Sequence, residues 1–511
     1  MISSRLGLFL WAFAQFTVLQ CVRSIKSMQS PYILAALLTA SGYTQFVSPD
    51  SLVSGTLMLS SFIALSAIEG SLSNHVVTSA SLACLVLACA SKDRKLVERQ
   101  SQRAVSIFAA VVYLVTGIHK LNSGFFTTEH SCASLYVAGA ISALPLFFLD
   151  FPVVFNGLSS LLRLAPIGAA VLELSLGILI PIAVLCELKT LRRSIVLAGS
   201  LFHAVLALPP SPLSVYPFSA IMVPIYVMLA PDTVVLESVV SRLIKPVWSK
   251  ALIGMLFAVA FQYAPSSLFD QDRLYEYPNY DLWSASLVWN NLWWSVIFGA
   301  CLSTPQSNDR CSPTVRIPFF GKVVLFFLFL FAMTPYIGMR NYPALAMFSN
   351  IRTEGDIPNH WTIDFDLFNY QKDWVEIQAS NFDSISKFQI DLGELFPDKL
   401  KSTLDRFGLA KEFIICPPSW ELSEGNYSTF DDFNIPFIEL RRRLSAIDLE
   451  ETSSPLFVDY IRHFPDGQVK QYHFDSTKVD PLDESVRSLN SFEKLFVRFR
   501  SFSNKYSPCR H

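Results

Sequence analysis

The sequence predicts a polytopic α-helical membrane bundle of about nine to eleven spans, followed by a C-terminal α+β domain outside the membrane. Of its 511 residues, 51% are hydrophobic, only 16% are charged and 42 are Phe, and the mean hydropathy is +0.38. A chain of this composition has too little polar surface for an ordinary soluble fold. Long apolar stretches recur up to residue 336, whereas charged and aromatic residues alternate in 337–511.

A helix needs about 20 residues to cross the hydrocarbon core of a bilayer. The apolar stretches that approach this length are about 5–22, 31–48, 53–70, 75–91, 104–120, 165–186, 193–209, 214–231, 251–264, 282–301 and 318–336, with 132–149 as a weaker candidate. We therefore divide the chain into three parts: N-terminal apolar segments at 1–50, which are spans or a cleaved signal peptide, a transmembrane domain at 51–336 and an outer domain at 337–511.

The distribution of Lys and Arg predicts the topology, because basic loops remain on the cytosolic side of a membrane. When the membrane crossings are counted from residue 75 onward, the four basic loops lie on one side: 92–103, 187–193, 241–250 and 302–317. The opposite side receives 121–164, 265–281 and the outer domain, which carries the sequon Asn426-Tyr-Ser428. This topology favours the endoplasmic reticulum or another endomembrane, with the outer domain in the lumen.

The outer domain has the pattern of a small α+β unit. Runs rich in β-branched and aromatic residues predict strands at Trp374-Val-Glu-Ile, Phe413-Ile-Ile, Leu456-Phe-Val-Asp-Tyr-Ile-Arg and Val469-Lys-Gln-Tyr-His-Phe, and helices are predicted at 393–408 and 437–447. Among the nine cysteines, Cys416 and Cys509 share this domain. In an oxidising lumen these two are the expected disulfide pair.

The charge balance and the absence of familiar motifs exclude several classes of protein. The formal net charge is −2, and no run of Lys and Arg is large enough to neutralise a phosphate backbone, so no nucleic-acid partner is expected. The sequence contains no P-loop, GxSxG or dinucleotide-binding fingerprint, and no cysteine spacing typical of a metal site. The expected partners are therefore the lipid bilayer and small molecules dissolved in it.

Two side chains that are energetically costly to place in or beside a membrane, those of His75 and Lys120, predict a reaction centre. His75 follows Asn74 where one apolar segment begins, and His119-Lys120 ends the next. A basic hinge at 92–103 is expected to turn the chain between arms of equal length, which would bring His75 and Lys120 to the same depth. Aromatic neighbours that remove water disfavour the charged form of an amine, so Lys120 is a candidate base. The alternative is an interfacial lysine whose amine reaches out to water.

A second helical hairpin, at 165–209, adds two polar groups to the candidate site. Glu173 lies on its first arm and His203 on its second, both nearer the outer side than the basic turn at 187–193. A buried carboxylate pairs with a partner or takes up a proton, and the expected partner of Glu173 is Lys120 or His203. The alternative for both residues is a structural hydrogen bond between helices.

The residues around these positions carry a family resemblance. Ser73-Asn-His75, Thr116-Gly-Ile-His-Lys-Leu-Asn, Leu172-Glu-Leu-Ser, Leu201-Phe-His203 and Ala346-Met-Phe-Ser-Asn-Ile-Arg-Thr-Glu354 resemble segments of the horizontally transferred transmembrane (HTTM) family, which includes the vitamin K-dependent gamma-glutamyl carboxylases. The resemblance covers roughly residues 50–350. It implies a membrane-bound helical fold with a reaction centre near the outer leaflet.

The resemblance also implies a chemistry. In the carboxylases, a lysine at the position of Lys120 is thought to deprotonate a reduced naphthoquinone such as vitamin K, and the histidine that His75 matches assists its oxygenation. Oxidation with O₂ gives a strong base, which removes a γ-proton from a protein glutamate, and the carbanion takes up CO₂. We expect His119, Asn74, Glu173 and His203 to surround and support the side chains of Lys120 and His75. His119 stands where the carboxylases have the first of two adjacent lysines, so the role of that lysine does not carry over. The outer domain is shorter than in the carboxylases, so substrate recognition does not carry over either.

Two functional hypotheses follow. In the first, the protein is a gamma-glutamyl carboxylase-like enzyme that oxidises a reduced isoprenoid quinone and couples this to carboxylation of a glutamate-containing protein. In the second, it is a non-catalytic scaffold that binds a quinone or lipid in the same place. The two hypotheses differ at Lys120, since a catalytic base requires its amine and a scaffold does not.

Overall fold

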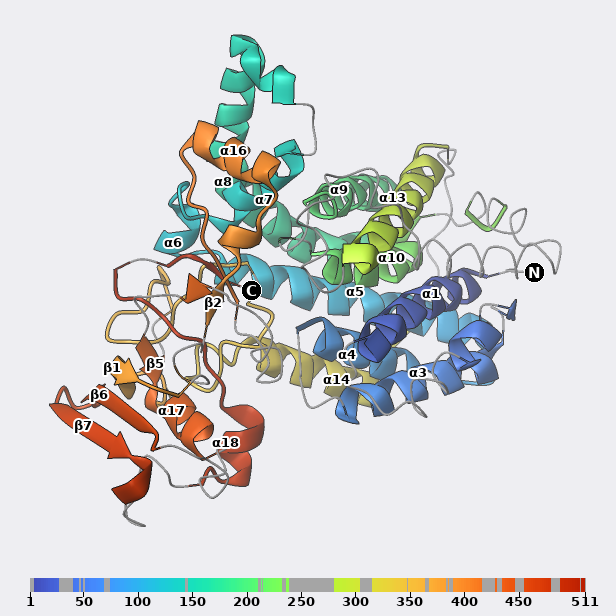
Figure 1. Ribbon diagram of the computed structural model, residues 1–511. Coiled ribbons are helices and arrows are strands. Elements are labelled where there is room, and N and C mark those ends of the chain that lie inside the picture. Colours follow the sequence, from blue (N-terminus) through green and yellow to red (C-terminus); the bar gives the residue numbers. More distant parts are fainter. Residues whose placement is uncertain are drawn as a thin grey trace. The chain divides into compact units, whose positions relative to one another are not determined.

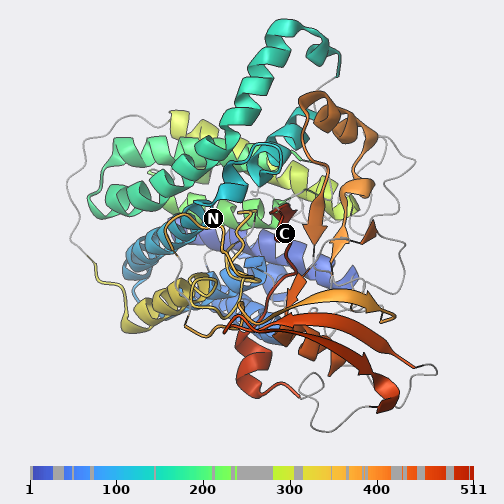
Figure 2. The ribbon, with the colours of Figure 1, turned by 90° about the vertical axis from the view of Figure 1, so that its left-hand side faces the viewer.

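The computed structural model describes residues 4–26, 40–45, 47–48, 51–68, 74–142, 146–209, 213, 215–231, 236–238, 280–303, 315–346, 348–363, 367–382, 385, 389–415, 428–429, 434–445, 455–478, 488–505 and 507–510. The fold is mostly helical with two small sheets (Figures 1 and 2). The chain forms two compact units: unit 1 is Met1–Leu114, Gly139–Pro145 and Leu172–Phe329, and unit 2 is Val115–Ala138, Leu146–Val171 and Leu330–His511.

Unit 1 is built from the apolar stretches of the sequence. Its helices are α1 (Arg5–Lys26), α3 (Leu52–Ile68), α4 (Asn74–Ala88), most of α5 (Arg94–His119), the second half of α8 (Pro152–Leu185), α9 (Lys189–Leu206), α10 (Tyr216–Leu229), α13 (Tyr280–Ser303) and most of α14 (Phe319–Ala332). Helix α10 contacts α1, α4, α9 and α13, and its residues from Ser219 onward are buried. The predicted span at 251–264 lies outside the described residues, as does the 31–39 part of the predicted span at 31–48.

Two of these helices are long and apolar enough to cross a membrane. They are α5, with 26 residues, and α8, with 34. At 1.5 Å per residue, α8 is about 51 Å long, which exceeds the hydrocarbon core of roughly 30 Å. Shorter apolar helices occur at Leu52–Ala64, Asn74–Ala88, Cys132–Ser142, Pro217–Leu229 and Phe319–Ala332.

The turn between α4 and α5 differs from the prediction. Helix α4 ends at Ala88 and α5 begins at Arg94, so most of the basic segment 92–103 is helical. Arg, Lys, Glu, Gln and Leu are good helix formers, and charge ends a membrane span without ending a helix. The two arms have 15 and 26 residues, so the premise of equal arms is wrong. Helix length therefore gives no reason to place His75 and Lys120 at one depth.

The C-terminal part of unit 2 contains the predicted strands and helices. An antiparallel sheet has the strand order β5 (Asn434–Pro436), β1 (Trp374–Ser380), β6 (Phe457–His463) and β7 (Val469–Asp475). In Figure 2 its longer strands are the orange and red arrows that run side by side. Helix α17 (Phe437–Leu444) packs on β1 and β5 (Figure 1), and a shared core of Val375, Ile435, Leu440, Val458 and Phe474 holds them together.

A second sheet in unit 2 brings the end of the sequence into the fold. Its order is β4 (Ser428–Thr429), β2 (Ile390–Asp391), β3 (Phe413–Ile415) and β8 (Cys509–Arg510), with β3 and β8 parallel. The expected helix at 393–408 is divided into a 3₁₀ turn, η4 (Gly393–Leu395), and α16 (Asp398–Phe407), because Pro397 interrupts it. Two further short helices, α6 (Ser123–Phe126) and α18 (Ser491–Phe496), complete this description of the unit.

Cys509 forms a disulfide bond, but its partner is not the expected Cys416. Cys509 is bonded to Cys132, which precedes it by 377 residues and begins helix α7 (Cys132–Ser142). The prediction of a Cys416–Cys509 pair is therefore wrong, and Cys416 itself lies outside the described residues. The two bonded cysteines belong to 121–164 and 337–511, which the charge pattern places on the same side of the membrane.

Candidate functional site

Lys120 lies in unit 2, directly after the last residue of α5. Its side chain is buried, at 6% exposure. Nζ donates to the Thr116 carbonyl oxygen at 3.4 Å and lies 5.8 Å from the centre of the Phe125 ring, which is a distance typical of cation–π attraction. An interfacial lysine of the snorkelling kind extends its amine to water, whereas this amine is enclosed by protein.

His119 is fixed by two hydrogen bonds. Its Nε2 lies 3.0 Å from the Ala332 carbonyl oxygen and its Nδ1 lies 2.8 Å from the Tyr336 hydroxyl. Because a carbonyl only accepts, Nε2 carries the proton, and Nδ1 accepts from Tyr336. This histidine therefore ties the end of α5 to the residues at and after the end of α14. We assign it a structural role beside Lys120.

Asn122 holds the backbone that follows Lys120. Its Nδ2 donates to the carbonyl oxygens of His119 at 2.8 Å and Ser349 at 2.6 Å. Its Oδ1 accepts from the Phe125 backbone N–H at 2.8 Å, as the N-cap of α6, and from Asn359 Nδ2 at 3.2 Å. The side chain is fully buried, so these bonds satisfy a polar group that is shielded from water.

Two further asparagines extend the same network. Asn359 Nδ2 also donates to the Asn350 carbonyl oxygen at 2.8 Å, and its Oδ1 accepts from the Arg352 N–H at 2.7 Å. Asn350 has a left-handed φ of 53°, which Asn tolerates better than most residues, and its side chain binds Cys132 N–H and the His130 and Ser507 carbonyl oxygens. We call Asn122, Asn350 and Asn359 the asparagine clamp.

Gly124 allows its own segment of backbone to lie close to Ser507 and to the asparagine clamp. A Cβ atom on Gly124 would lie 2.9 Å from Ser507 Cβ and 3.1 Å from Asn359 Nδ2. The clamp and the Cys132–Cys509 disulfide therefore act on one short stretch of chain, 122–132. They set the position of Phe125, whose ring faces the Lys120 amine.

His360 also supports the backbone next to Lys120, from a segment that is distant in the sequence. Its Nε2 donates to the Ile118 carbonyl oxygen at 3.0 Å, and its Nδ1 accepts from the N–H groups of Thr362 and Ile363 at 3.3 and 3.0 Å. A proton on Nδ1 would break both acceptor contacts. Burial lowers the pKa of His360, against the opposing effect of its bond to Ile118.

This histidine predicts a loss of stability in acid. Below about pH 6.5 the unfolded chain takes up a proton that folded His360 resists, so its stabilisation is present above that pH and lost as the pH falls. We expect the difference in Tm between the wild type and His360→Asn to shrink from about pH 7.5 to pH 5, since other titrating groups are common to both proteins. Thermal unfolding in detergent at the two pH values measures this, and a constant difference contradicts it.

The segment after α14 carries a second buried polar cluster. Asn341 donates to the Glu354 carboxylate, and its own oxygens accept from the Arg500 N–H at 3.0 Å and the Arg500 guanidinium at 3.2 Å. Burial raises the pKa of the Glu354 carboxyl, and the positive charge of Arg510 opposes this rise. Polar contacts of Asn341 thus fix the segment after α14 to Arg500 and Glu354.

His75 and Asn74 lie in unit 1, in the first turn of α4. Both are buried, at 7% and 1% exposure. Their backbone carbonyl oxygens accept from Ser79 Oγ at 2.7 Å and Thr78 Oγ1 at 2.6 Å. The expected start of a helix at Asn74 is confirmed. His75 belongs to unit 1, whereas Lys120 belongs to unit 2.

His203 lies in unit 1 at one end of a hydrogen-bonded chain of three side chains, with Tyr113 in the middle. The Tyr113 hydroxyl of α5 is 2.6 Å from His203 Nε2 and 2.8 Å from the Tyr226 hydroxyl of α10. The imidazole stacks on Trp294 of α13, with ring centres 5.3 Å apart. A Cβ on Gly199 would lie 1.8 Å from the Tyr226 hydroxyl, so only glycine leaves room for this arrangement.

The sequence predicted part of this second cluster. His203 and Glu173 are both buried in unit 1, but His203 bonds to Tyr113 in place of the expected Glu173, and its Nδ1 has no hydrogen-bond partner among the described residues. Glu173 acts electrostatically on Tyr113. Tyr113, Tyr226 and Trp294 were not predicted. Their one signal in the sequence is that they are polar aromatics inside apolar segments.

The described residues contain no group of three or more His, Cys, Asp or Glu side chains placed to hold a metal ion. Comparison with models of protein families finds no match to this chain. Neither the curated proteins nor the solved structures include a significant match.

Proposed function

We propose that the protein is a multi-pass membrane protein with about nine to eleven spans, of the HTTM type. Helix α8 supports membrane insertion. A core helix of a soluble protein is also apolar, but it is mostly buried, whereas only 33% of the most apolar window of α8 is buried. Its exposed side chains include Leu164, Ile167, Val171, Ile178 and Ile182. Such a surface is stable in lipid and unfavourable in water.

The Cys132–Cys509 disulfide supports the proposed topology. It joins two segments that the positive-inside rule assigns to one side of the membrane. A buried disulfide forms and persists in an oxidising compartment, such as the lumen of the endoplasmic reticulum. The outer domain is accordingly proposed to be lumenal.

The buried amine of Lys120 carries the enzymatic part of the proposal. An ionisable side chain at the end of an apolar helix is costly, and its retention inside protein indicates a functional role. We propose that an aromatic hydroquinone binds beside these two side chains, with the Phe125 ring for stacking and the amine next to a hydroxyl. The proposed enzyme oxidises a reduced isoprenoid quinone, with coupling to carboxylation of protein glutamate, as in a gamma-glutamyl carboxylase-like lyase that uses O₂ and CO₂.

In this proposal each residue has a defined task. A reduced quinone supplies two electrons and acidic hydroxyl protons when bound. Lys120 Nζ accepts a hydroxyl proton as general base, and Phe125 excludes water from the amine. The asparagine clamp holds both in position. His75, proposed to assist the oxidation, and the pair Glu173 and His203 belong to unit 1 and are proposed as supporting groups there.

The test is the rate of quinone oxidation and of glutamate carboxylation in reconstituted protein, with the gain of one CO₂ unit per glutamate read by mass spectrometry. Lys120→Met keeps the length and the apolar stem of the side chain and removes the amine. We expect it to lower product formation by about 10²-fold or more without changing the amount of folded protein. The matched control is Lys322→Met, in apolar helix α14, which should remain active.

Two results would contradict the proposal. Full activity of Lys120→Met removes this residue as the base. Absence of product from the wild type with every reduced quinone tested removes the enzyme hypothesis and favours the second one, a scaffold that binds quinone or lipid.

A further inference from the structure

Helix α18, at the end of unit 2, presents apolar side chains that the protein does not cover. Phe492, Leu495 and Phe496 are 39%, 62% and 50% exposed. Leu367 and Phe368 continue the same surface, because the rings of Phe368 and Phe492 lie 5.8 Å apart and those of Phe492 and Phe496 lie 5.4 Å apart. We call these five residues the α18 patch.

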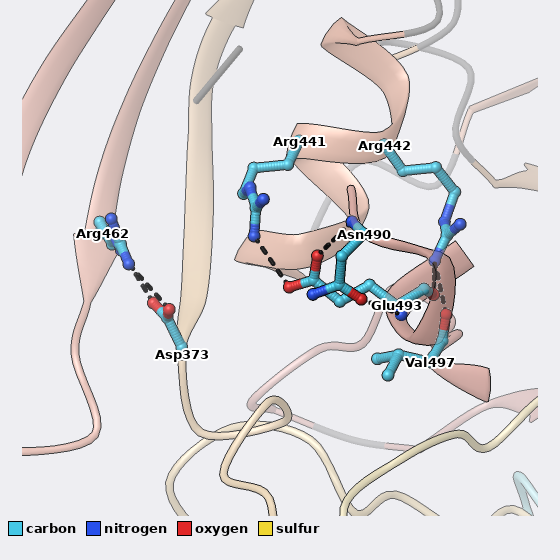
Figure 3. Close-up of polar contacts among 7 residues, drawn as sticks. All are labelled: Asp373, Arg441, Arg442, Arg462, Asn490, Glu493 and Val497. Carbon is cyan, nitrogen blue, oxygen red and sulfur yellow. Dashed lines mark hydrogen bonds and ion pairs between the residues drawn. The ribbon is translucent and has the colours of Figure 1, made fainter. Parts of the chain in front are cut away.

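The patch is presented on a rigid support. Asn490 and Glu493 form a capping box at the start of α18. As Figure 3 shows, Arg441 and Arg442 of α17 both point to α18: Arg441 binds the Glu493 carboxylate at 3.3 Å, and Arg442 binds the backbone carbonyl oxygens of Glu493 and Val497. A six-residue helix is not stable in isolation, so these contacts hold its exposed apolar face in place.

The same helix is tied to the last turn of the apolar helix α14. Arg340 donates to the carbonyl oxygens of Leu495 and Phe496, at the C-terminal end of α18. Its guanidinium lies 5.8 Å from the ring of Phe331 in α14. Arg340 is buried, and burial lowers its pKa to about 10, which leaves it charged at neutral pH. Arg340 therefore links the C-terminal end of α18 to the last residues of α14.

The charges on α18 suit a lipid headgroup. Lys494 is exposed beside Leu495 and Phe496, whereas the one carboxylate of the helix, Glu493, is buried and paired with Arg441. Exposed aromatic and aliphatic residues next to a lysine are typical of helices that lie in the membrane interface. Aromatic residues are also enriched at the depth where spanning helices end.

We propose that the α18 patch inserts into the lipid headgroup region, so that unit 2 rests on the bilayer surface at this helix. This rests on the proposed membrane insertion of α8 and α14. It goes beyond the proposed enzyme, because a surface of this kind sets the distance of the outer domain from the membrane whatever reaction the protein catalyses. The occupant is the lipid surface of the bilayer in which the protein is embedded.

The test places a fluorescent label at single cysteines in the full-length protein in proteoliposomes. The seven cysteines that remain after subtracting the Cys132–Cys509 pair from nine are replaced by alanine. Labels are attached at Leu495→Cys in the patch, at Ile178→Cys on α8 as the lipid control, and at Val469→Cys on β7 as the matched control. Ile178 and Val469 are 52% and 55% exposed, close to Leu495.

We expect brominated lipids to quench the label at 495 about threefold more strongly than the label at 469, and aqueous iodide to show the reverse order. A label at 495 that matches 469, while 178 is quenched by lipid, overturns the α18 proposal and leaves membrane insertion intact. Iodide quenching of both 178 and 495 overturns membrane insertion itself. Protection of 495 from both quenchers indicates a protein occupant and also overturns the proposal. An intact Cys132–Cys509 bond, read by mass spectrometry, verifies folding of each variant.

Discussion

Asn122→Ala is expected to lower the free energy of unfolding of unit 2 by about 4 kcal/mol, because it leaves three buried backbone groups without partners at roughly 1–3 kcal/mol each. These groups are the carbonyl oxygens of His119 and Ser349 and the N–H of Phe125. Their burial prevents water from replacing the lost bonds. Because Asn122 N-caps α6, which carries Phe125, activity at Lys120 should fall together with stability.

Pulse proteolysis in urea measures this effect, with the appearance of fragments from 330–511 as the readout. Asn122→Asp is nearly isosteric, but it sets a carboxylate oxygen against two carbonyl oxygens, so it should be at least as unstable as Asn122→Ala. The control is Asn381→Ala, which removes bonds to Phe457 and Pro455 from an exposed side chain and should cost under about 1 kcal/mol. Equal effects at 122 and 381 would contradict the role of the clamp.

Loss of the Cys132–Cys509 disulfide is expected to cost unit 2 about 5 kcal/mol, since the bond closes a loop of 377 residues and the entropy lost by the unfolded chain increases with loop length. Cys509→Ser should therefore shift the urea midpoint of unit 2 more strongly than substitution of any cysteine outside this bond. The strand pair of β3 and β8 depends on this bond, because β8 has only two residues and includes Cys509.

The same proteolysis assay tests this prediction, with and without reductant. Cys186→Ser is the control, since Cys186 is free and exposed. Reductant should bring the wild type to the level of Cys509→Ser and leave the variant unchanged. A wild type that keeps its midpoint after complete reduction would show that the noncovalent contacts of the asparagine clamp suffice to hold 122–132.

Local patterns predicted the elements of unit 2 well. The strands at Trp374, Phe413, Leu456 and Val469 all appear, because β-branched and aromatic residues between turn-forming residues describe a half-buried strand without reference to distant contacts. The helix at 437–447 also appears, as α17. Long apolar stretches likewise predicted the described helices of unit 1.

The sequence did not predict which residues from distant segments bind each other. Cys509 and Cys132 are far apart along the chain, and considering only cysteines within 337–511 led to the wrong partner, although the predicted topology had already placed 121–164 on the same side. Asn122 shows the same limit. The presence of Asn122 in the sequence does not indicate that its side chain binds Ser349, 227 residues later. A hydrogen bond between distant segments produces no periodic pattern in the sequence.

For the candidate site, the sequence predicted the burial of the individual residues. Lys120, His119, Asn74, His75, Glu173 and His203 are all buried, as expected for costly side chains retained in apolar segments. The geometric argument that joined His75 to Lys120 assumed that charged residues end a helix. Helix α5 continues through them, since helix propensity depends on the side chain's conformational freedom and not on its charge.

The position of Cys132 in the chain has a consequence for synthesis. At about 5–20 residues per second, the ribosome needs roughly 20–75 s to add the 377 residues between Cys132 and its partner. Under the proposed lumenal placement of the outer domain, the Cys132 thiol is without its partner for that time in a compartment that holds oxidants. A wrong pairing formed in this interval has to be exchanged before the native bond can close, which takes seconds to hours depending on oxidant and isomerase.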